Sequence, residues 1–453
     1  MIKTGYFKGI FLQYVLLTLV CFAFYGNTIL NDYAYDDSIV ITENQFTQKG
    51  VSGIPEIFAN NSLRGSYGNN PTAPRYRPLS LASFAIEIQL FGQNPHVSHF
   101  INVLLLGLTS LVLYQLLSKV FGRQKPENGL LDFPLMAVLL FIAHPVHTEP
   151  IANIKGRDEI LALLFSLSAT LFVLKYLDTR RRRHLTWGAL LFLAALFSKE
   201  NAITFLAIVP LTIYYYRQEK PGTYVRCLMP LVVSTAVFLG IGRLAVGSGG
   251  PHPSDDIITE PFFYATLSER FATVFYTFGR YLKLLVFPHP LTIHYDAYHI
   301  QLANWKSPAV WFSILAYASA AFCAVRNLKK KSVISYGILF YLCTFSIVSN
   351  LPFTIGNFMS ERSMFVPSLG FVVIVAWLLS TRVPAPSHKN AILVALLLLG
   401  LFKTHSRNQV WKNDFTLFID KSSFSLISIF GGSQAFLSHG LHSCSILGVA
   451  TAR

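Results

Sequence analysis

The chain has 453 residues, of which 53% are hydrophobic and only 13% are charged. This composition excludes a water-soluble globular protein of that length and indicates a multi-spanning membrane protein. The formal net charge of +15 does not indicate nucleic-acid binding, because the basic residues cluster in short loops between apolar runs and are not interleaved with aromatic side chains.

The apolar runs predict an all-α, polytopic protein with about eleven transmembrane helices. Lys3 and Lys8 precede the first run, which we interpret as an uncleaved signal anchor. With a cytoplasmic N-terminus, basic clusters such as Lys175–Arg183 and Arg326–Lys331 all fall on the cytoplasmic side, as the positive-inside rule requires. The predicted spans are Ile10–Leu30, Phe100–Leu117, Phe133–Ala143, Ile160–Leu177, Leu185–Phe197, Ala202–Tyr216, Cys227–Ala245, Ala309–Val325, Val333–Val348, Phe365–Leu379 and Ala391–Phe402.

One further run, Phe271–Phe287, carries Arg280 and Lys283 and follows Arg270. If this run crossed the membrane, the basic cluster after the next span would lie outside. We therefore predict an interfacial or re-entrant helix on the outer side.

A pair of adjacent carboxylates, Asp36 and Asp37, follows the first span in the stretch Asn27–Asn44. Because carboxylates are costly inside a bilayer, the pair is expected at the membrane surface. Repulsion between the two groups tends to raise the pKa of one of them, which would provide a general base. The alternative is a simple polar turn after a helix.

Two arginines, Arg75 and Arg77, lie in the same outer loop, just before the amphipathic stretch Leu81–Phe91. Guanidinium groups match phosphate oxygens bidentately, so the pair could bind a lipid phosphate. Simple anchoring to anionic headgroups is the alternative.

The third predicted span ends in a polar run that contains His144, Pro145, His147 and Glu149. The two histidines invite a zinc interpretation, but Pro145 interrupts the helix that would align them and no His-Glu-x-x-His pattern is present. Polar contacts to a sugar or a phosphate are the functional interpretation that we prefer, and a structured helix end is the alternative.

Glu361 and Arg362 place opposite charges next to each other at the outer end of the tenth predicted span. Lys199 and Glu200 do the same at the end of the fifth. Either pair could be a local ion pair or an anchor at the membrane edge.

Taken together, these motifs resemble the transmembrane and tetratricopeptide-repeat-containing O-mannosyltransferases. The resemblance covers roughly residues 8 to 420, and the run from His144 to Glu149 is its most specific part. The motifs that carry it are Asn31-Asp32-Tyr33 with Asp36-Asp37, Tyr76-Arg77-Pro78-Leu79, His144-Pro145-Val146-His147-Thr148-Glu149, Gly156-Arg157, Ser198-Lys199-Glu200, Phe287-Pro288-His289-Pro290-Leu291, Glu361-Arg362 and Trp411-Lys412-Asn413.

The resemblance implies a GT-C-like glycosyltransferase that moves a sugar, mannose in the family's image, from a polyprenyl phosphate to a hydroxyl acceptor such as protein Ser or Thr. Asp36 and Asp37 match the family's catalytic acidic pair in position, and a single displacement of this kind would invert the anomeric centre. No cofactor is certain, and dependence on a divalent metal stays open. The residues expected to contact the donor phosphate or sugar are Arg75, Arg77, His144, His147, Glu149, Arg157, Glu361 and Arg362.

Two parts are expected: a GT-C-like membrane domain over residues 1–403 and a short outward tail over residues 404–453. The family carries an array of tetratricopeptide repeats in this position, but Ser422–Arg453 shows no such period. We expect a truncated or frame-shifted end, or a natural short form.

The expected partners are the lipid bilayer, the polyprenyl-phosphate sugar and an acceptor protein or glycan, with no nucleic acid. The side of transfer would be periplasmic or lumenal, and the bacterial inner membrane is favoured over the endoplasmic reticulum. The alternatives are a non-catalytic membrane scaffold and a secondary transporter, although the charges lie at helix ends rather than near mid-membrane.

Overall fold

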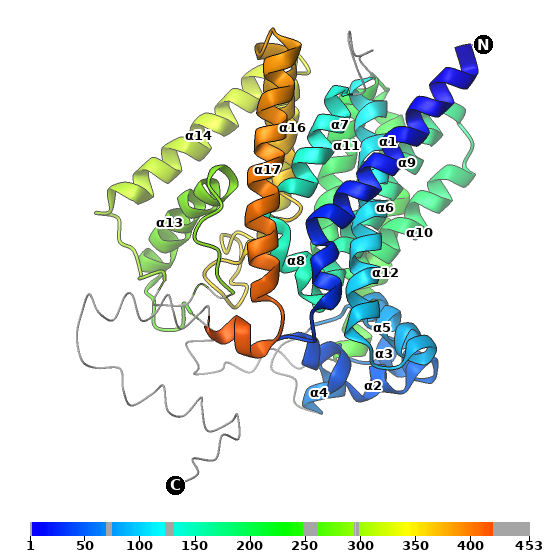
Figure 1. Cartoon of the computed structure of the whole chain (residues 1–453), viewed down its shortest axis with the longest axis vertical. Helices are drawn as coiled ribbons and strands as arrows, with labels where there is room; N and C mark the ends of the chain where they lie inside the picture. Colours follow the sequence, from blue (N-terminus) through cyan, green and yellow to red (C-terminus); the bar gives the residue numbers. More distant parts are fainter. Residues whose placement is uncertain are drawn as a thin grey trace.

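The structure, a computed structural model, describes residues 2–68, 75–122, 131–247, 261–293, 295 and 299–419. Over these residues the chain is helical and forms no β-strand. Its long helices form one bundle, in which most of them run side by side (Figure 1). They are α1 (Ile2–Tyr25), α6 (Pro95–Phe121), α7 (Phe133–Ala143), α9 (Arg157–Thr179), α10 (Arg183–Ser198), α11 (Phe205–Tyr216), α12 (Pro221–Val246), α13 (Leu267–Val286), α14 (Pro308–Leu328), α15 (Val333–Ser346), α16 (Ser368–Arg382) and α17 (Pro386–Val410).

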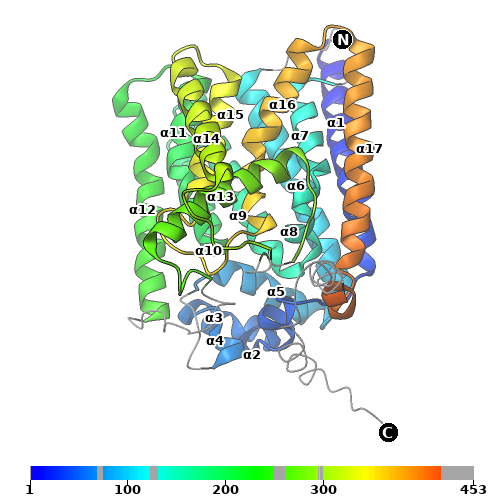
Figure 2. The same cartoon turned by 90° about the vertical axis from the view of Figure 1, so that its left-hand side faces the viewer.

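The bundle has two different ends. The N-terminus and the α14–α15 and α16–α17 connections lie at one end (Figure 2). A layer of short helices covers the other end, which we call the loop end. This layer contains α2 (Gln45–Gln48), α3 (Ile54–Ala59), α4 (Arg64–Tyr67) and α5 (Pro78–Phe91).

The layer of short helices has a small apolar core of its own. Ile41, Ile57, Leu81 and Phe84 are buried there together with Ile154, which belongs to the connection before α9. The layer is therefore packed onto the bundle, and it positions the stretch of chain that follows α1.

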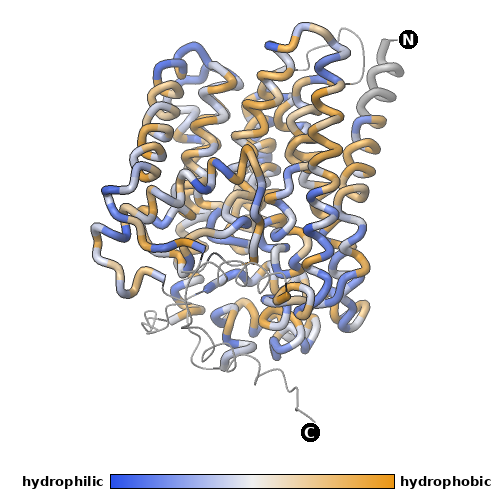
Figure 3. The backbone as a smooth tube through the Cα atoms, turned by 60° about the vertical axis from the view of Figure 1, so that its left-hand side comes forward, coloured by the Kyte–Doolittle hydropathy of each residue, from blue (hydrophilic) through white to orange (hydrophobic). Residues whose placement is uncertain are grey.

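Hydrophobic residues predominate along the long helices (Figure 3), and many of their large apolar side chains are exposed. On α14, Phe312 and Phe322 are exposed, and on α17, Leu399 and Phe402 are exposed. An apolar surface of this extent is typical of helices that face lipid. Within the described residues, five helices are long and apolar enough to cross a membrane. The number is six if α7 and the helical segment Pro145–Ala152, which is bent by 55° relative to α7, count as one span.

Each of the eleven predicted spans overlaps a helix of the bundle. Several of these helices are shorter than a bilayer requires, including α10 with 16 residues and α15 with 14. The α-helical class and a multi-pass membrane protein are thus supported, whereas the count of eleven spans stays a prediction.

The run predicted to be interfacial forms α13, whose N-terminus is closed by a capping box between Thr266 and Glu269. The helix lies obliquely across the bundle (Figure 2). Its position relative to a bilayer remains a prediction.

Candidate active site

The two adjacent acids after α1 have different surroundings. Asp37 is fully buried, and its carboxylate accepts hydrogen bonds from the backbone N–H groups of Ala34 (3.0 Å) and Lys155 (2.8 Å). Burial raises the pKa of Asp37 to about 7, with a contribution from Asp36, although the backbone N–H groups act in the opposite direction. Both oxygens of Asp37 are therefore engaged: Oδ2 closes its own loop at Ala34, and Oδ1 joins this loop to the turn that precedes α9.

Asp36 lies at the edge of a partly open cluster of charges. Its Oδ2 accepts hydrogen bonds from Lys155 Nζ and from Arg362 Nη1, the latter at 3.2 Å, and its side chain is 14% exposed. Burial alone would raise the pKa of Asp36, but the charges of Lys155 and Arg362 outweigh it and hold the pKa well below its usual range. Asp36 is thus ionised, and it is held by two cations that a competing anion could attract.

Glu149 positions Arg362 from the opposite side. The backbone N–H of Arg362 donates to Glu149 Oε2 at 2.9 Å, and the guanidinium Nε lies 3.5 Å from Oε1. Ser360 Oγ donates to the same carboxylate at 3.2 Å. Glu149 therefore has its place in the site as a support for Arg362.

Arg75 brings a further positive charge to this cluster. Its charge helps to lower the pKa of Asp36. Among the residues that the structure describes, its guanidinium forms no hydrogen bond or ion pair. Burial, with Arg77 acting in the same direction, lowers the pKa of Arg75 to about 10, so the group still carries its charge at neutral pH.

Arg77 belongs to a neighbouring network of acids and bases. Its guanidinium donates to Asp158 at 2.7 Å and grips both carboxylate oxygens of Glu200. Lys199 Nζ contacts Glu159 at 2.7 Å and Asp158 at 3.4 Å. The Arg77 pairs join the layer of short helices to the start of α9 and to the short helix Glu200–Thr204, and the Lys199 pairs join the end of α10 to α9.

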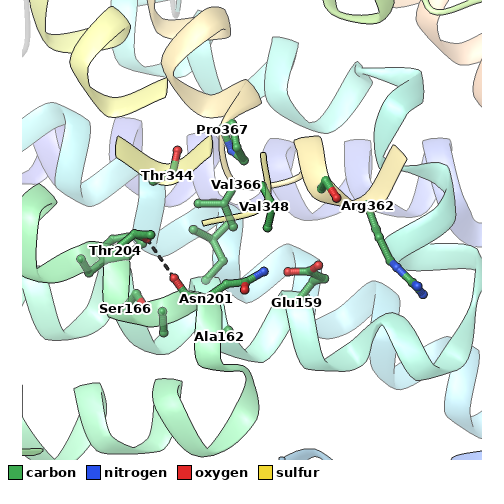
Figure 4. Close-up of a pocket in the computed structure, with 14 residues that line it drawn as sticks. Glu159, Ala162, Ser166, Asn201, Thr204, Thr344, Val348, Arg362, Val366 and Pro367 are labelled. Carbon is green, nitrogen blue, oxygen red and sulfur yellow. Dashed lines mark hydrogen bonds between the residues drawn. The ribbon is translucent and has the colours of Figure 1, made fainter. Parts of the chain in front are cut away.

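A small cavity lies next to this network, between α9, α11, α15 and the chain before α16 (Figure 4). Glu159 and Asn201 lie next to each other in the lining of this cavity, and the guanidinium of Arg362 is directed away from it (Figure 4). The cavity measures about 20 Å³. This volume suits about one water molecule and is far too small for a sugar.

The structure does not bring Arg157 to the cluster around Asp36. Its guanidinium is buried, pairs with Glu87 at 2.8 Å and donates to Asn102 Oδ1 at 2.8 Å and to the Ser98 carbonyl at 3.0 Å. The guanidinium also stacks on Phe84. This sealed environment gives no support to a contact between Arg157 and a donor phosphate.

His144 and His147 are also enclosed. Nε2 of His144 lies 2.9 Å from the Leu285 carbonyl, and Nε2 of His147 lies 2.8 Å from Ser368 Oγ. The His147 ring packs on Phe141 and Phe365, and the His144 ring packs on Phe371. The geometry matches the structured helix end that the sequence left open, and it gives no support to contact with a sugar. Within the described ranges, no group of three or more His, Cys, Asp and Glu side chains could hold a metal ion.

Glu361 points away from its neighbour Arg362. Its Oε1 accepts from the backbone N–H of Thr292 at 2.5 Å and lies 3.3 Å from the Tyr295 hydroxyl. Burial and the charge of Glu149 raise the pKa of Glu361 to about 8, although Arg407 acts in the opposite direction. Glu361 and Arg362 therefore do not form the local ion pair that their adjacency suggests.

Sequence reasoning missed the roles of Lys155, Asp158 and Lys199 in this site. None of the three is among the residues that the sequence analysis selects for contact with the donor. A usable signal was present, because few charged side chains occur in this chain and these lie at the starts or ends of apolar helices.

No protein-family model matches the chain. Relatives named protein O-mannosyl-transferase match most of it. One from Caenorhabditis elegans is 25% identical over 87% of this chain and 55% of its own length. A human relative named TMTC1 is 27% identical over 87% and 49%, and a Drosophila melanogaster relative named Tmtc3 is 25% identical over 90% and 51%.

The chain spans about half the length of these relatives. All three are animal proteins, so the comparison gives no support to the predicted preference for a bacterial inner membrane. That preference is withdrawn. The C-terminal stretch Ser422–Arg453, on which the missing repeats were argued, lies outside the described residues.

Proposed function

Because this chain belongs to the family of protein O-mannosyl-transferases, we propose that it transfers mannose from a polyprenyl-phosphate donor to a hydroxyl of a protein acceptor. The observation that carries the proposal is the cluster at the loop end, where one ionised acid, Asp36, lies among Lys155, Arg362 and Arg75. Such a cluster contains the base and the anion-binding groups that transfer from a lipid phosphate needs.

In the proposed reaction, the acceptor oxygen attacks the anomeric carbon of mannose while Asp36 takes the hydroxyl proton. The bond between the anomeric carbon and the phosphate oxygen breaks, and the lipid phosphate leaves with both electrons of that bond. This single displacement inverts the anomeric centre. Arg75, Arg362 and Lys155 would carry the charge of the leaving phosphate.

The electrostatics of the cluster suggest how the donor would activate the base. In the absence of an anion, Lys155 and Arg362 hold the pKa of Asp36 low, which makes it a weak base. A phosphate that draws these two cations toward itself would raise the pKa of Asp36. Proton abstraction would then depend on a bound donor.

Asp37 receives a different role in this proposal. Since both of its oxygens accept backbone hydrogen bonds, it would hold the loop to the start of α9 and leave the chemistry to Asp36. Arg77 and Glu149 would position the cluster. Dependence on a divalent metal stays open.

We further propose a GT-C-like membrane domain over residues 1–403 with about eleven spans, an outward C-terminal segment over residues 404–453, and transfer on the outer side of the membrane. The apolar helices and the buried charged cluster around Asp36 at the loop end support this arrangement.

The proposal is tested with membranes that carry the full chain, a synthetic polyprenyl-phosphate donor with radiolabelled mannose, and a Ser/Thr-rich acceptor peptide. Transfer should exceed that of control membranes, and the Asp36→Asn/Asp37→Asn double variant at matched expression should transfer nothing above background. If the unaltered chain transferred nothing to peptide or to endogenous membrane proteins, a non-catalytic scaffold or a transporter would be favoured.

A further inference from the structure

Two backbone N–H groups of the loop that carries Asp36 donate hydrogen bonds to a distant part of the chain. The Asp32 N–H donates to the Lys412 carbonyl at 2.8 Å. The Tyr35 N–H donates to Asp414 Oδ1 at 2.7 Å. The loop thus depends on residues that directly follow α17.

The contact continues into a small buried core. Trp411 is fully buried and lies with Ala34 and Leu417 in one apolar cluster. The side-chain amide of Asn31 donates to the carbonyls of Asn408 (3.1 Å) and Trp411 (3.2 Å). Residues 408–417, which we call the brace, are therefore held in place independently of Asp414.

The backbone at Tyr35 needs such support. Its φ is +56°, in the left-handed region that side chains other than glycine rarely adopt. Tyr35 immediately precedes Asp36, so its conformation sets the direction of the Asp36 side chain toward Lys155 and Arg362. The hydrogen bond from the Tyr35 N–H to Asp414 favours this conformation.

We propose that the brace holds the loop in its working conformation and that Asp414 is a positioning residue for Asp36. The inference deepens the proposed function, on which its catalytic consequence rests. Among the described residues, the side chain of Asp414 hydrogen-bonds only to the Tyr35 N–H, so its loss would move Asp36 without removing a group that contacts substrate.

The test uses the full chain in detergent and combines amide hydrogen exchange with the transfer assay. Asp414→Ala removes the acceptor, whereas Asp414→Asn keeps an Oδ1 acceptor and removes only the charge. Phe415→Ala, at an exposed side chain of the same segment, is the matched control.

Asp414→Ala should speed exchange at Tyr35 and lower kcat roughly fivefold at unchanged donor KM, as expected for the loss of one hydrogen bond. Asp414→Asn should keep both the exchange rate at Tyr35 and kcat at the values of the unaltered chain, and Phe415→Ala should change neither quantity. Unaltered exchange at Tyr35 in Asp414→Ala would overturn the inference, and so would faster exchange with normal kcat. If the unaltered chain lacked transfer but Asp414→Ala still loosened the loop, the brace would be supported and the proposed function contradicted.

Discussion

Two clusters of buried charge lie at the same end of the bundle, and they differ in their access to solvent. In the open cluster, the side chains of Asp36 and Arg362 are 14% and 29% exposed, whereas in the sealed cluster those of Arg157 and Glu87 are 1% and 5% exposed. An anionic ligand can reach the Asp36–Arg362 pair because both side chains are partly exposed, whereas it cannot reach the buried Arg157–Glu87 pair. An arginine at the loop end is therefore a candidate for phosphate binding only if a phosphate can replace the carboxylate that it already contacts.

The largest expected effect is on the sealed cluster. Arg157→Met leaves Glu87 buried without its cation, which should lower the free energy of unfolding by about 3–5 kcal/mol. Thermal unfolding of the purified protein in detergent measures this loss. A variant with unchanged stability and a raised donor KM would instead place Arg157 among the phosphate ligands.

A smaller effect concerns Asp37 and its dependence on pH. The folded protein raises the pKa of this carboxyl from 3.8 to about 7, so the folded state binds the proton more tightly than the unfolded state. This group's contribution to stability should be fully present below about pH 4, should fall as the pH rises to about 7, and should then stay constant. Asp36, with its lowered pKa, has the opposite sign, and its contribution is lost only below about pH 4.

Asp37→Asn should therefore flatten the fall of the melting temperature between pH 4 and pH 7 relative to the unaltered chain. Glu43→Gln, at an exposed acid of the same loop, is the control and should leave the profile unchanged. An unchanged slope in Asp37→Asn would show that Asp37 does not titrate in this range.

The expected effect at Arg75 is smaller still, and it falls on binding. Arg75→Gln should raise the donor KM roughly tenfold, a loss of about 1.4 kcal/mol. Stability should hardly change, because the guanidinium forms no ion pair within the described residues. An unchanged KM together with weaker vesicle binding would indicate an anchor to lipid headgroups.

The smallest effect is expected at an exposed pair. Lys49 and Glu56 are 2.6 Å apart, with side chains that are 48% and 42% exposed. Lys49→Ala should change the free energy of unfolding by less than about 1 kcal/mol and leave transfer unchanged. A larger loss of stability would contradict the argument that breaking an exposed ion pair costs little and breaking a buried ion pair costs much in the free energy of unfolding.

The sequence alone predicts the helices well, because continuous apolar runs encode them directly. It does not decide how many cross the membrane, since α10 and α15 are as apolar as spans but shorter than a bilayer. It also predicts the acidic pair, but not the division of roles within it. That division depends on the N–H of Lys155, which lies 118 residues away from Asp37 in the sequence.

Lys155 and Arg157 show the same limit within one short segment. Lys155 lies in the turn before α9 and Arg157 is the first residue of α9, yet Lys155 contacts Asp36 and Arg157 contacts Glu87. A sequence pattern records that both are basic and near a helix start. Only the fold decides which of them meets the open cluster.

The most direct test of the account compares Asp36→Asn with Asp37→Asn in the transfer assay, with each rate divided by the amount of folded protein. We predict that Asp36→Asn keeps the melting temperature to within a few degrees and loses about 10²–10⁴-fold in transfer rate. Asp37→Asn should lose folded protein but keep measurable transfer per folded molecule. Full transfer by folded Asp36→Asn would contradict the account.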